Sequence, residues 1–232
     1  MSNRYFQPWK SLKTVLHLKW LAPFLTVPVL FVASMFIESW LQESGMISYI
    51  PVGKRSIFSL WRIVMLTGMV AAPLVTMFLS EAWKKWKNSG VLLTSYFFGT
   101  IFSVFVLTTT AMVLNALGIL SPLGVSLETI SQILFARCIF AAVWVVAAAT
   151  LCSSITSGPG GAALSFGLFS IALLPGLSGS SISWWFIAPL GDMVTTVDSL
   201  SNGWDVSMAV AAHSMIYLAA GFFILKKATL LR

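Results

Sequence analysis

A short, strongly basic segment, residues 80–90 (SEAWKKWKNSG), separates two long apolar runs of the sequence. Its charged residues and tryptophans are Glu81, Trp83, Lys84, Lys85, Trp86 and Lys87. Lysine and arginine beside apolar spans mark the cytoplasmic side of a membrane protein, and tryptophan gathers at membrane interfaces. The segment therefore predicts a cytoplasmic connection between two spans, and its position orients every other span. Two interpretations are open: a loop with interfacial tryptophans and orienting lysines, or a helix that also contacts a soluble partner.

The composition requires a membrane environment. Of 232 residues, 58% are hydrophobic and 9% are charged, and the mean hydropathy is +0.90. Soluble domains carry about 25% charged residues, so this chain cannot cover a water-facing surface. The length allows several helices of about 20 residues and no soluble domain, which predicts a single transmembrane domain over residues 1–232. Although the net charge of +7 would suit nucleic acid, the basic residues lie beside apolar spans, so we expect contact with a lipid bilayer and none with nucleic acid.

Six apolar runs predict an all-α integral membrane protein with six transmembrane helices. The predicted spans are residues 20–40, 57–79, 91–117, 130–153, 162–177 and 206–225. An amphipathic interfacial helix is expected before them, over residues 4–19. Because the first span is long and follows this helix, we expect a retained anchor and no cleaved signal peptide. Residues 178–205 are half apolar but broken by Gly and Pro, which predicts a re-entrant or interfacial outer segment between spans five and six.

The basic residues support one orientation of these spans. The predicted inner segments hold Arg4, Lys10, Lys13, Lys19, Lys84, Lys85, Lys87, Lys226, Lys227 and Arg232. The predicted outer loops hold Lys54 and Arg55. This bias predicts a multi-pass protein of the plasma membrane with both termini cytoplasmic.

Cysteine, alanine and threonine residues give three further expectations about the helices. Cys138 and Cys152 are separated by about 21 Å of helical rise, which is too far for a disulfide, so two buried thiols are expected. The alanines at 147–149 would let a neighbouring helix come close. The threonines at 108–110 could bond across helices, although threonine in a span more often bonds its own backbone.

Arg62 and Arg137 are the ionisable residues that lie clearly inside predicted spans, apart from His213. A charge inside a span is costly, which makes each arginine a functional candidate. Each is also close enough to the outer end to snorkel, or to pair with Glu38 or Glu128. Two interpretations therefore stand for both arginines, structural pairing or the lining of a substrate path.

Asp192 and His213 are weaker candidates. Asp192 lies in the broken outer segment, where it is either a solvated turn residue or part of a gate. His213 lies in the sixth span, where it is either a hydrogen-bonded interior group or a participant in transport.

The sequence lacks the common catalytic patterns. It contains no phosphate-binding GxxxxGK[ST] pattern, no HExxH and no GxSxG. Histidine, cysteine and carboxylate residues do not recur at metal-binding spacing. We therefore expect no catalytic residue, metal site or cofactor in this chain, so any ATP-driven work needs a separate subunit.

With its residues arranged in this way, the chain resembles the membrane subunit of a type-2 ABC exporter. That family has an amphipathic first helix, six spans with both termini inside, a coupling loop between spans two and three, and a broken outer segment before span six. The nearest local match is Ala188-Pro189-Leu190, then Gly203-Trp204, then a last span ending in Lys226-Lys227. One departure is that Asn88-Ser89-Gly90 stands where a Gly-Thr often follows the acidic residue of the coupling loop.

The resemblance implies a permease that is not itself an enzyme. Its contact with an ATP-binding subunit, which would hold ATP and Mg, would be Glu81, Trp83, Lys84, Lys85 and Trp86. The pore would form with a second permease subunit, either the same chain or a different one. Small permeases of this kind often export antimicrobial peptides or protect against them, so the expected cargo is a peptide or an amphipathic, lipid-like compound.

Two other classes of protein fit parts of the sequence. A non-transporting multispan scaffold of the Yip type would share the amphipathic start and the apolar bulk. It would not need the basic connection or the broken outer segment. An intramembrane enzyme would need polar residues that converge at membrane depth, and Arg62, Arg137 and His213 are scattered along the chain.

Overall fold

The computed structural model describes residues 20, 22–46, 55–87, 91–122, 124, 127–172 and 203–230, and the ordered elements of these ranges are helices. The interfacial helix expected over residues 4–19 lies outside the described residues. So does most of the expected outer segment, including Asp192. Within α6, side chains are described from Cys138 onward, which leaves those of Glu128 and Arg137 outside as well.

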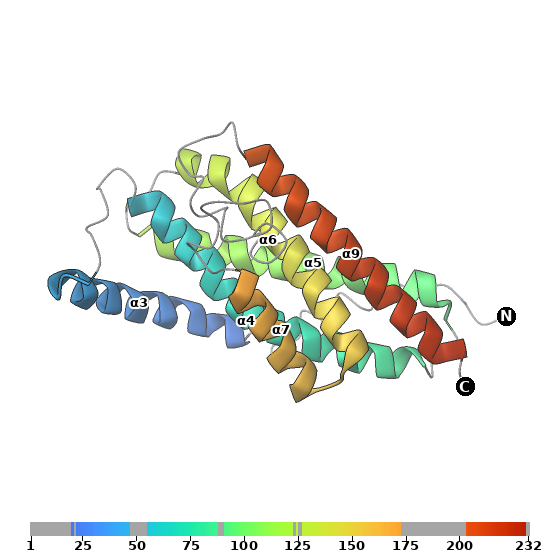
Figure 1. Ribbon diagram of the computed structural model, residues 1–232. Coiled ribbons are helices and arrows are strands. Elements are labelled where there is room, and N and C mark those ends of the chain that lie inside the picture. Colours follow the sequence, from blue (N-terminus) through green and yellow to red (C-terminus); the bar gives the residue numbers. More distant parts are fainter. Residues whose placement is uncertain are drawn as a thin grey trace.

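The described chain contains one short 3-10 helix and six α-helices (Figure 1). They are η1 (Ala22–Leu25), α3 (Thr26–Glu43), α4 (Arg55–Trp86), α5 (Leu93–Leu120), α6 (Leu127–Ile155), α7 (Pro159–Ala172) and α9 (Gly203–Leu230). Five helical segments are long and apolar enough to cross a membrane, namely Ala22–Glu43, Arg62–Trp86, Leu93–Leu120, Cys138–Ile155 and Val210–Ala228. The prediction of an all-α, multispan membrane protein is therefore confirmed. The expected fifth span corresponds to α7, an apolar helix of 14 residues.

The structure corrects the predicted connection after the second span. That span was expected to end at Leu79, with a polar connection starting at Ser80, but α4 continues without a break to Trp86. The reason is that Phe78, Ala82 and Trp86 recur at helical spacing, so the apolar face of the helix continues past the lysines. The α3 helix likewise extends three residues beyond the predicted span.

The ends of α7 and α9 also differ from expectation. The predicted inner turn over residues 156–161 is shorter, because α7 already begins at Pro159. Proline suits the first position of a helix, and Gly158 directly before it adopts φ +67°. The last helix begins at Gly203, so the final three residues of the expected outer segment are helical.

The helix α6 lies at the centre of the bundle. Its side chains from Trp144 through Thr150 are all buried, and it packs against α4, α5, α7 and α9. Figure 1 shows α9 running alongside α6 over much of its length. Small residues allow this close approach: a Cβ added at Gly221 of α9 would lie 3.1 Å from Cγ2 of Thr150. The alanine patch predicted for close packing is fully buried.

The helix α3 lies at one edge of the bundle (Figure 1). It buries Val27 and Phe31 while exposing large apolar side chains such as Phe36 and Trp40. In a bilayer such side chains suit the hydrocarbon of the lipid. The attachment of α3 to the bundle therefore depends on a few contacts with α4.

The two ends of the bundle differ in charge. Trp83 of α4, Phe97 of α5 and Leu225 of α9 belong to one buried cluster, which brings the ends of these helices together. We call this the basic end, defined by the exposed lysines Lys84, Lys85, Lys87, Lys226 and Lys227. Arg62 and Glu38 lie at the opposite end, near the start of α4 and the end of α3.

Candidate functional site

The last two turns of α4 have an exposed charged face and a buried apolar face. We call residues 81–87 the α4 tip. Its exposed side chains are Glu81, Lys84, Lys85 and Lys87. Its buried side chains are Ala82, Trp83 and Trp86. Because successive helical side chains point about 100° apart, this short segment divides its residues between solvent and core.

Trp83 anchors the α4 tip to α6. Its side chain is 4% exposed, and its indole Nε1 donates a hydrogen bond of 2.9 Å to Oγ of Ser153, near the end of α6. The indole also stacks on the ring of Phe97 in α5, with centroids 5.6 Å apart and planes inclined by 13°. One side chain of the tip thus contacts two other helices.

Trp86 fixes the chain locally. Its Nε1 donates a 2.8 Å hydrogen bond to the carbonyl oxygen of Val91, just before α5. This bond ties the end of α4 to the start of α5. The α4 tip is therefore held by two buried indoles, while its lysines are left exposed.

The residues predicted to contact a partner thus divide into two groups. Glu81, Lys84 and Lys85 are exposed and suited to such a contact. Trp83 and Trp86 face the bundle, so neither is available as an interfacial anchor or as a docking residue. Sequence reasoning missed Ser153 and Phe97, because pairings across 70 and 14 positions leave no local sequence signal.

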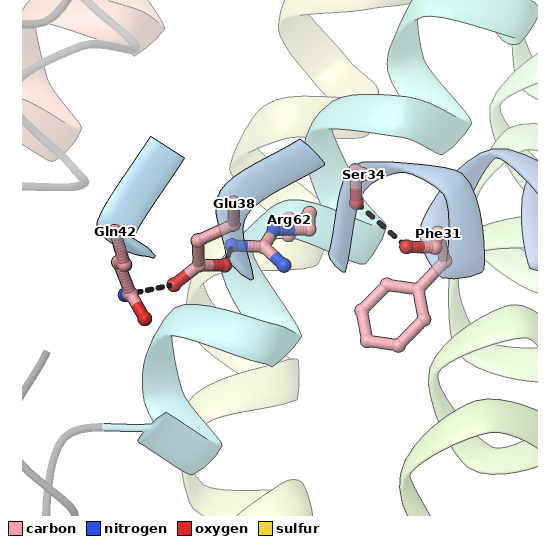
Figure 2. Close-up of polar contacts among 5 residues, drawn as sticks. All are labelled: Phe31, Ser34, Glu38, Gln42 and Arg62. Carbon is pink, nitrogen blue, oxygen red and sulfur yellow. Dashed lines mark hydrogen bonds and ion pairs between the residues drawn. The ribbon is translucent and has the colours of Figure 1, made fainter. Parts of the chain in front are cut away.

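A second polar group joins α3 to α4 at the opposite end (Figure 2). The guanidinium of Arg62 forms an ion pair with Oε2 of Glu38, and the two side chains are 18% and 21% exposed. Gln42, one turn further along α3, donates a 3.1 Å hydrogen bond from Nε2 to the other carboxylate oxygen. The structure therefore contains the Arg62–Glu38 pairing that the sequence offered as one of two interpretations. A role for Arg62 in a substrate path stays a prediction.

His213 lies in an aromatic group between α9 and α6. The centroid of its buried ring is 5.8 Å from that of Tyr217, and the Tyr217 centroid is 5.9 Å from that of the Trp144 indole.

The hydroxyl of Thr108 donates a hydrogen bond to the carbonyl oxygen of Val104, so it bonds the backbone of its own helix, as the sequence favoured. Thr76, Ser80, Ser103, Thr150 and Ser214 do the same one turn back.

The described part of the chain contains neither a metal site nor a disulfide. Within those residues, no group of three histidine, cysteine or carboxylate side chains lies close enough to hold a metal ion. Cys138 and Cys152 are buried and free, as predicted. The α4 tip is therefore the site with the clearest functional geometry.

Comparisons with protein-family models, with curated proteins and with solved structures give no match to this chain. The structure by itself establishes a helical membrane protein with several spans. Function must then be argued from the geometry of the α4 tip and from the sequence.

Proposed function

We propose that this chain is the permease subunit of an ATP-driven exporter. It forms a substrate pathway with a second permease subunit, the same or different, and a separate ATP-binding subunit powers it. The observation that carries the proposal is the α4 tip, a charged helical surface held firmly to the bundle.

The shape of the α4 tip suits a specific protein contact. Glu81 lies one turn before Lys84 and Lys85, so charges of both signs share the exposed side of a helix. Because the buried indoles fix the backbone, a partner would not need to order a loose loop on binding, and preorganisation of this kind favours affinity. A helix also transmits a displacement along its axis, whereas an unanchored loop would absorb it.

The position of the α4 tip suits a partner that uses ATP. The exposed lysines of α4 and α9 lie at the same end of the bundle, and lysine-rich ends are typically cytoplasmic. ATP is available on that side of the plasma membrane. The chain contains no phosphate-binding sequence pattern, so ATP and Mg belong to the partner in this proposal.

The cargo that we propose is a peptide or an amphipathic, lipid-like compound, moved outward. Its support is the resemblance to type-2 exporters. In this scheme Arg62, Arg137 and Asp192 are candidates for the pathway or its gate. Of these three, the structure describes the side chain of Arg62.

The proposal is tested by purifying the chain from its native membrane in a mild detergent. We expect an ATP-binding subunit to co-purify with the native chain. The double variant Lys84→Glu/Lys85→Glu should retain at least about tenfold less of it, because reversed charges at an interface cost several kcal/mol. The control Lys226→Glu/Lys227→Glu makes the same change in net charge at the same end, and it should retain the partner.

Two outcomes would contradict this account. If no nucleotide-binding protein accompanies the native chain, under conditions that keep known complexes intact, the non-transporting scaffold becomes the better description. If the Lys84→Glu/Lys85→Glu variant keeps its full share of the ATPase, the contact lies elsewhere and the α4 tip is not the docking surface.

A further inference from the structure

We propose that Trp83 is a positioning residue that links the α4 tip to α5, α6 and α9, so that a partner bound at the tip moves these helices together. The inference rests on the proposed function, because it needs a partner that displaces the tip. It goes further by assigning the transmission to a particular hydrogen bond, from Trp83 to Ser153.

The two indoles of the α4 tip have different kinds of partner. Trp86 bonds the carbonyl of Val91, five positions along the chain, so its bond closes the short connection between α4 and α5. Trp83 bonds Ser153, 70 positions away on α6. Both side chains are buried and lie one turn apart on the same helix. Of these two bonds, the one from Trp83 is therefore the one that joins α4 to a helix distant in the sequence.

Ser153 passes this connection deeper into α6. Its side chain is 6% exposed, and its hydroxyl accepts from Trp83 while donating a 2.9 Å bond to the carbonyl oxygen of Thr150. A buried hydroxyl that both accepts and donates is held in one orientation. The indole, the serine and the α6 backbone thus form a continuous chain of hydrogen bonds.

Thr150 is also a point of close approach between α9 and α6. A Cβ added at Gly221 would lie 3.3 Å from the Thr150 carbonyl oxygen, the same atom that Ser153 bonds. Close packing of this kind resists independent sliding of the two helices. In this proposal a movement of α6 at Thr150 therefore carries α9 with it.

The other face of the indole links α5. Phe97 stacks on Trp83 and also contacts the ring of Phe222 in α9, with centroids 5.2 Å apart. Trp83 is thus the side chain of the tip at which contacts to α5 and α6 meet. By contrast, α3 shares the distant Arg62–Glu38 pair with α4, and its buried residues Val27 and Phe31 do not belong to the cluster around Trp83.

The experiment measures how far nucleotide moves α6 relative to α3. Spin labels are placed at Ser44→Cys and Ser157→Cys, exposed positions just after α3 and α6, in a Cys138→Ala/Cys152→Ala background. The purified complex with its ATPase is measured by pulsed EPR without nucleotide and after trapping with ATP and vanadate. We expect a change in distance in the parent protein.

Trp83→Phe and Ser153→Ala should each keep the ATPase bound, since neither alters the exposed surface. Each should reduce the fraction of molecules with the shifted distance roughly two- to tenfold, the effect of one buried hydrogen bond on a two-state equilibrium. Trp86→Phe is the matched control and should behave like the parent. If Trp83 had only a structural role, Trp83→Phe would lower the yield of folded protein. It would not leave the ATPase bound while reducing the distance change.

The inference is overturned if both variants shift as fully as the parent, or if the parent complex does not shift at all. Should Trp83→Phe fail to fold, Ser153→Ala decides alone, because it removes only one oxygen. If the parent chain retains no ATPase, the proposed docking surface itself fails, and the inference fails with it. These results are distinguishable within one set of samples.

Discussion

Trp83 and Lys84 are neighbours in α4, but the first side chain is buried and the second is exposed. The indole is buried against α5 and α6, whereas the lysine is exposed at the end of the bundle. The tryptophans and the lysines of the basic segment thus have different environments, which its composition alone does not distinguish. Its tryptophans hold the helix in place, and its lysines are exposed to a partner or to lipid head groups.

Arg62 is the other residue whose environment decides its interpretation. Its ion pair with Glu38 is partly buried, and Gln42 bonds the remaining carboxylate oxygen. A partly buried pair with good hydrogen bonding is costly to break from one side, because the remaining charge loses its partner. The pair therefore holds the end of α3 against α4.

Breaking this pair should loosen α3. Arg62→Met or Glu38→Gln alone should lower the free energy of unfolding by about 1–3 kcal/mol, and the double variant should lose less than the sum. Glu43→Gln is the control, because its carboxylate accepts only an exposed 3.4 Å bond from Ser39 and should change stability by under about 0.5 kcal/mol. Thermal unfolding in detergent provides the comparison. Equal effects of all three single variants would show that the ion pair contributes nothing specific.

Among the helices, the sequence predicted existence and type better than ends. Long apolar runs identified each helix in the described ranges, because burial of the backbone in lipid requires helical hydrogen bonding. The α4 helix runs past the predicted span because the apolar spacing continues through Trp86. For this basic segment the sequence left a loop and a helix both open. The start of α7 differs from the prediction because the Gly-rich sequence over residues 156–161 predicts a turn. Pro159 within it suits the first position of a helix, and α7 begins there.

The candidate site was only half predictable. The exposed charges of the α4 tip could be identified from sequence, since they stand together. The partners of its tryptophans could not, because Ser153 and Phe97 reach them through the folding of the bundle. The Arg62–Glu38 pair could be predicted from the sequence, because both residues lie near the predicted outer ends of adjacent spans.

Gly68 allows α4 to pack closely against Phe169 of α7. A Cβ added at Gly68 would overlap the ring of Phe169, which is itself buried and lies 6.0 Å from the indole of Trp144. The ring is 1% exposed, so other side chains surround it. The helix α7 is the shortest of the described α-helices, so losing this contact would remove much of its support.

Gly68→Ala should therefore separate α7 from α4 and destabilise the protein by about 1–3 kcal/mol. Gly118→Ala in α5 is the matched control. It meets nothing within 4 Å, and should be neutral or stabilising by up to about 1 kcal/mol, because alanine favours a helix over glycine. In detergent, the apparent melting temperature of Gly68→Ala should fall below that of the native protein. That of Gly118→Ala should equal the native value or exceed it. A tolerated Gly68→Ala would contradict the packing described.

At the scale of the whole molecule, the helices alternate in direction. The ends of α4, α6 and α9 meet the start of α5 at the basic end, where the buried cluster around Trp83 joins them. At the opposite end, α3 and α4 share the Arg62–Glu38 pair. The molecule thus has one end where several helices are tied together and exposed lysines gather. The proposed transporter would receive its driving force at this end.

The most direct test of that claim is photocrosslinking in living cells. A benzoylphenylalanine at Lys85, on the exposed side of the α4 tip, should form an adduct with a protein that carries a nucleotide-binding domain. The same probe at Phe102, exposed in the middle of α5, should give no such adduct. An ATP-binding protein captured from Lys85 alone would establish the docking surface and its cytoplasmic side. Capture of no ATP-binding protein from Lys85, while the chain is present and folded in the membrane, would contradict the account.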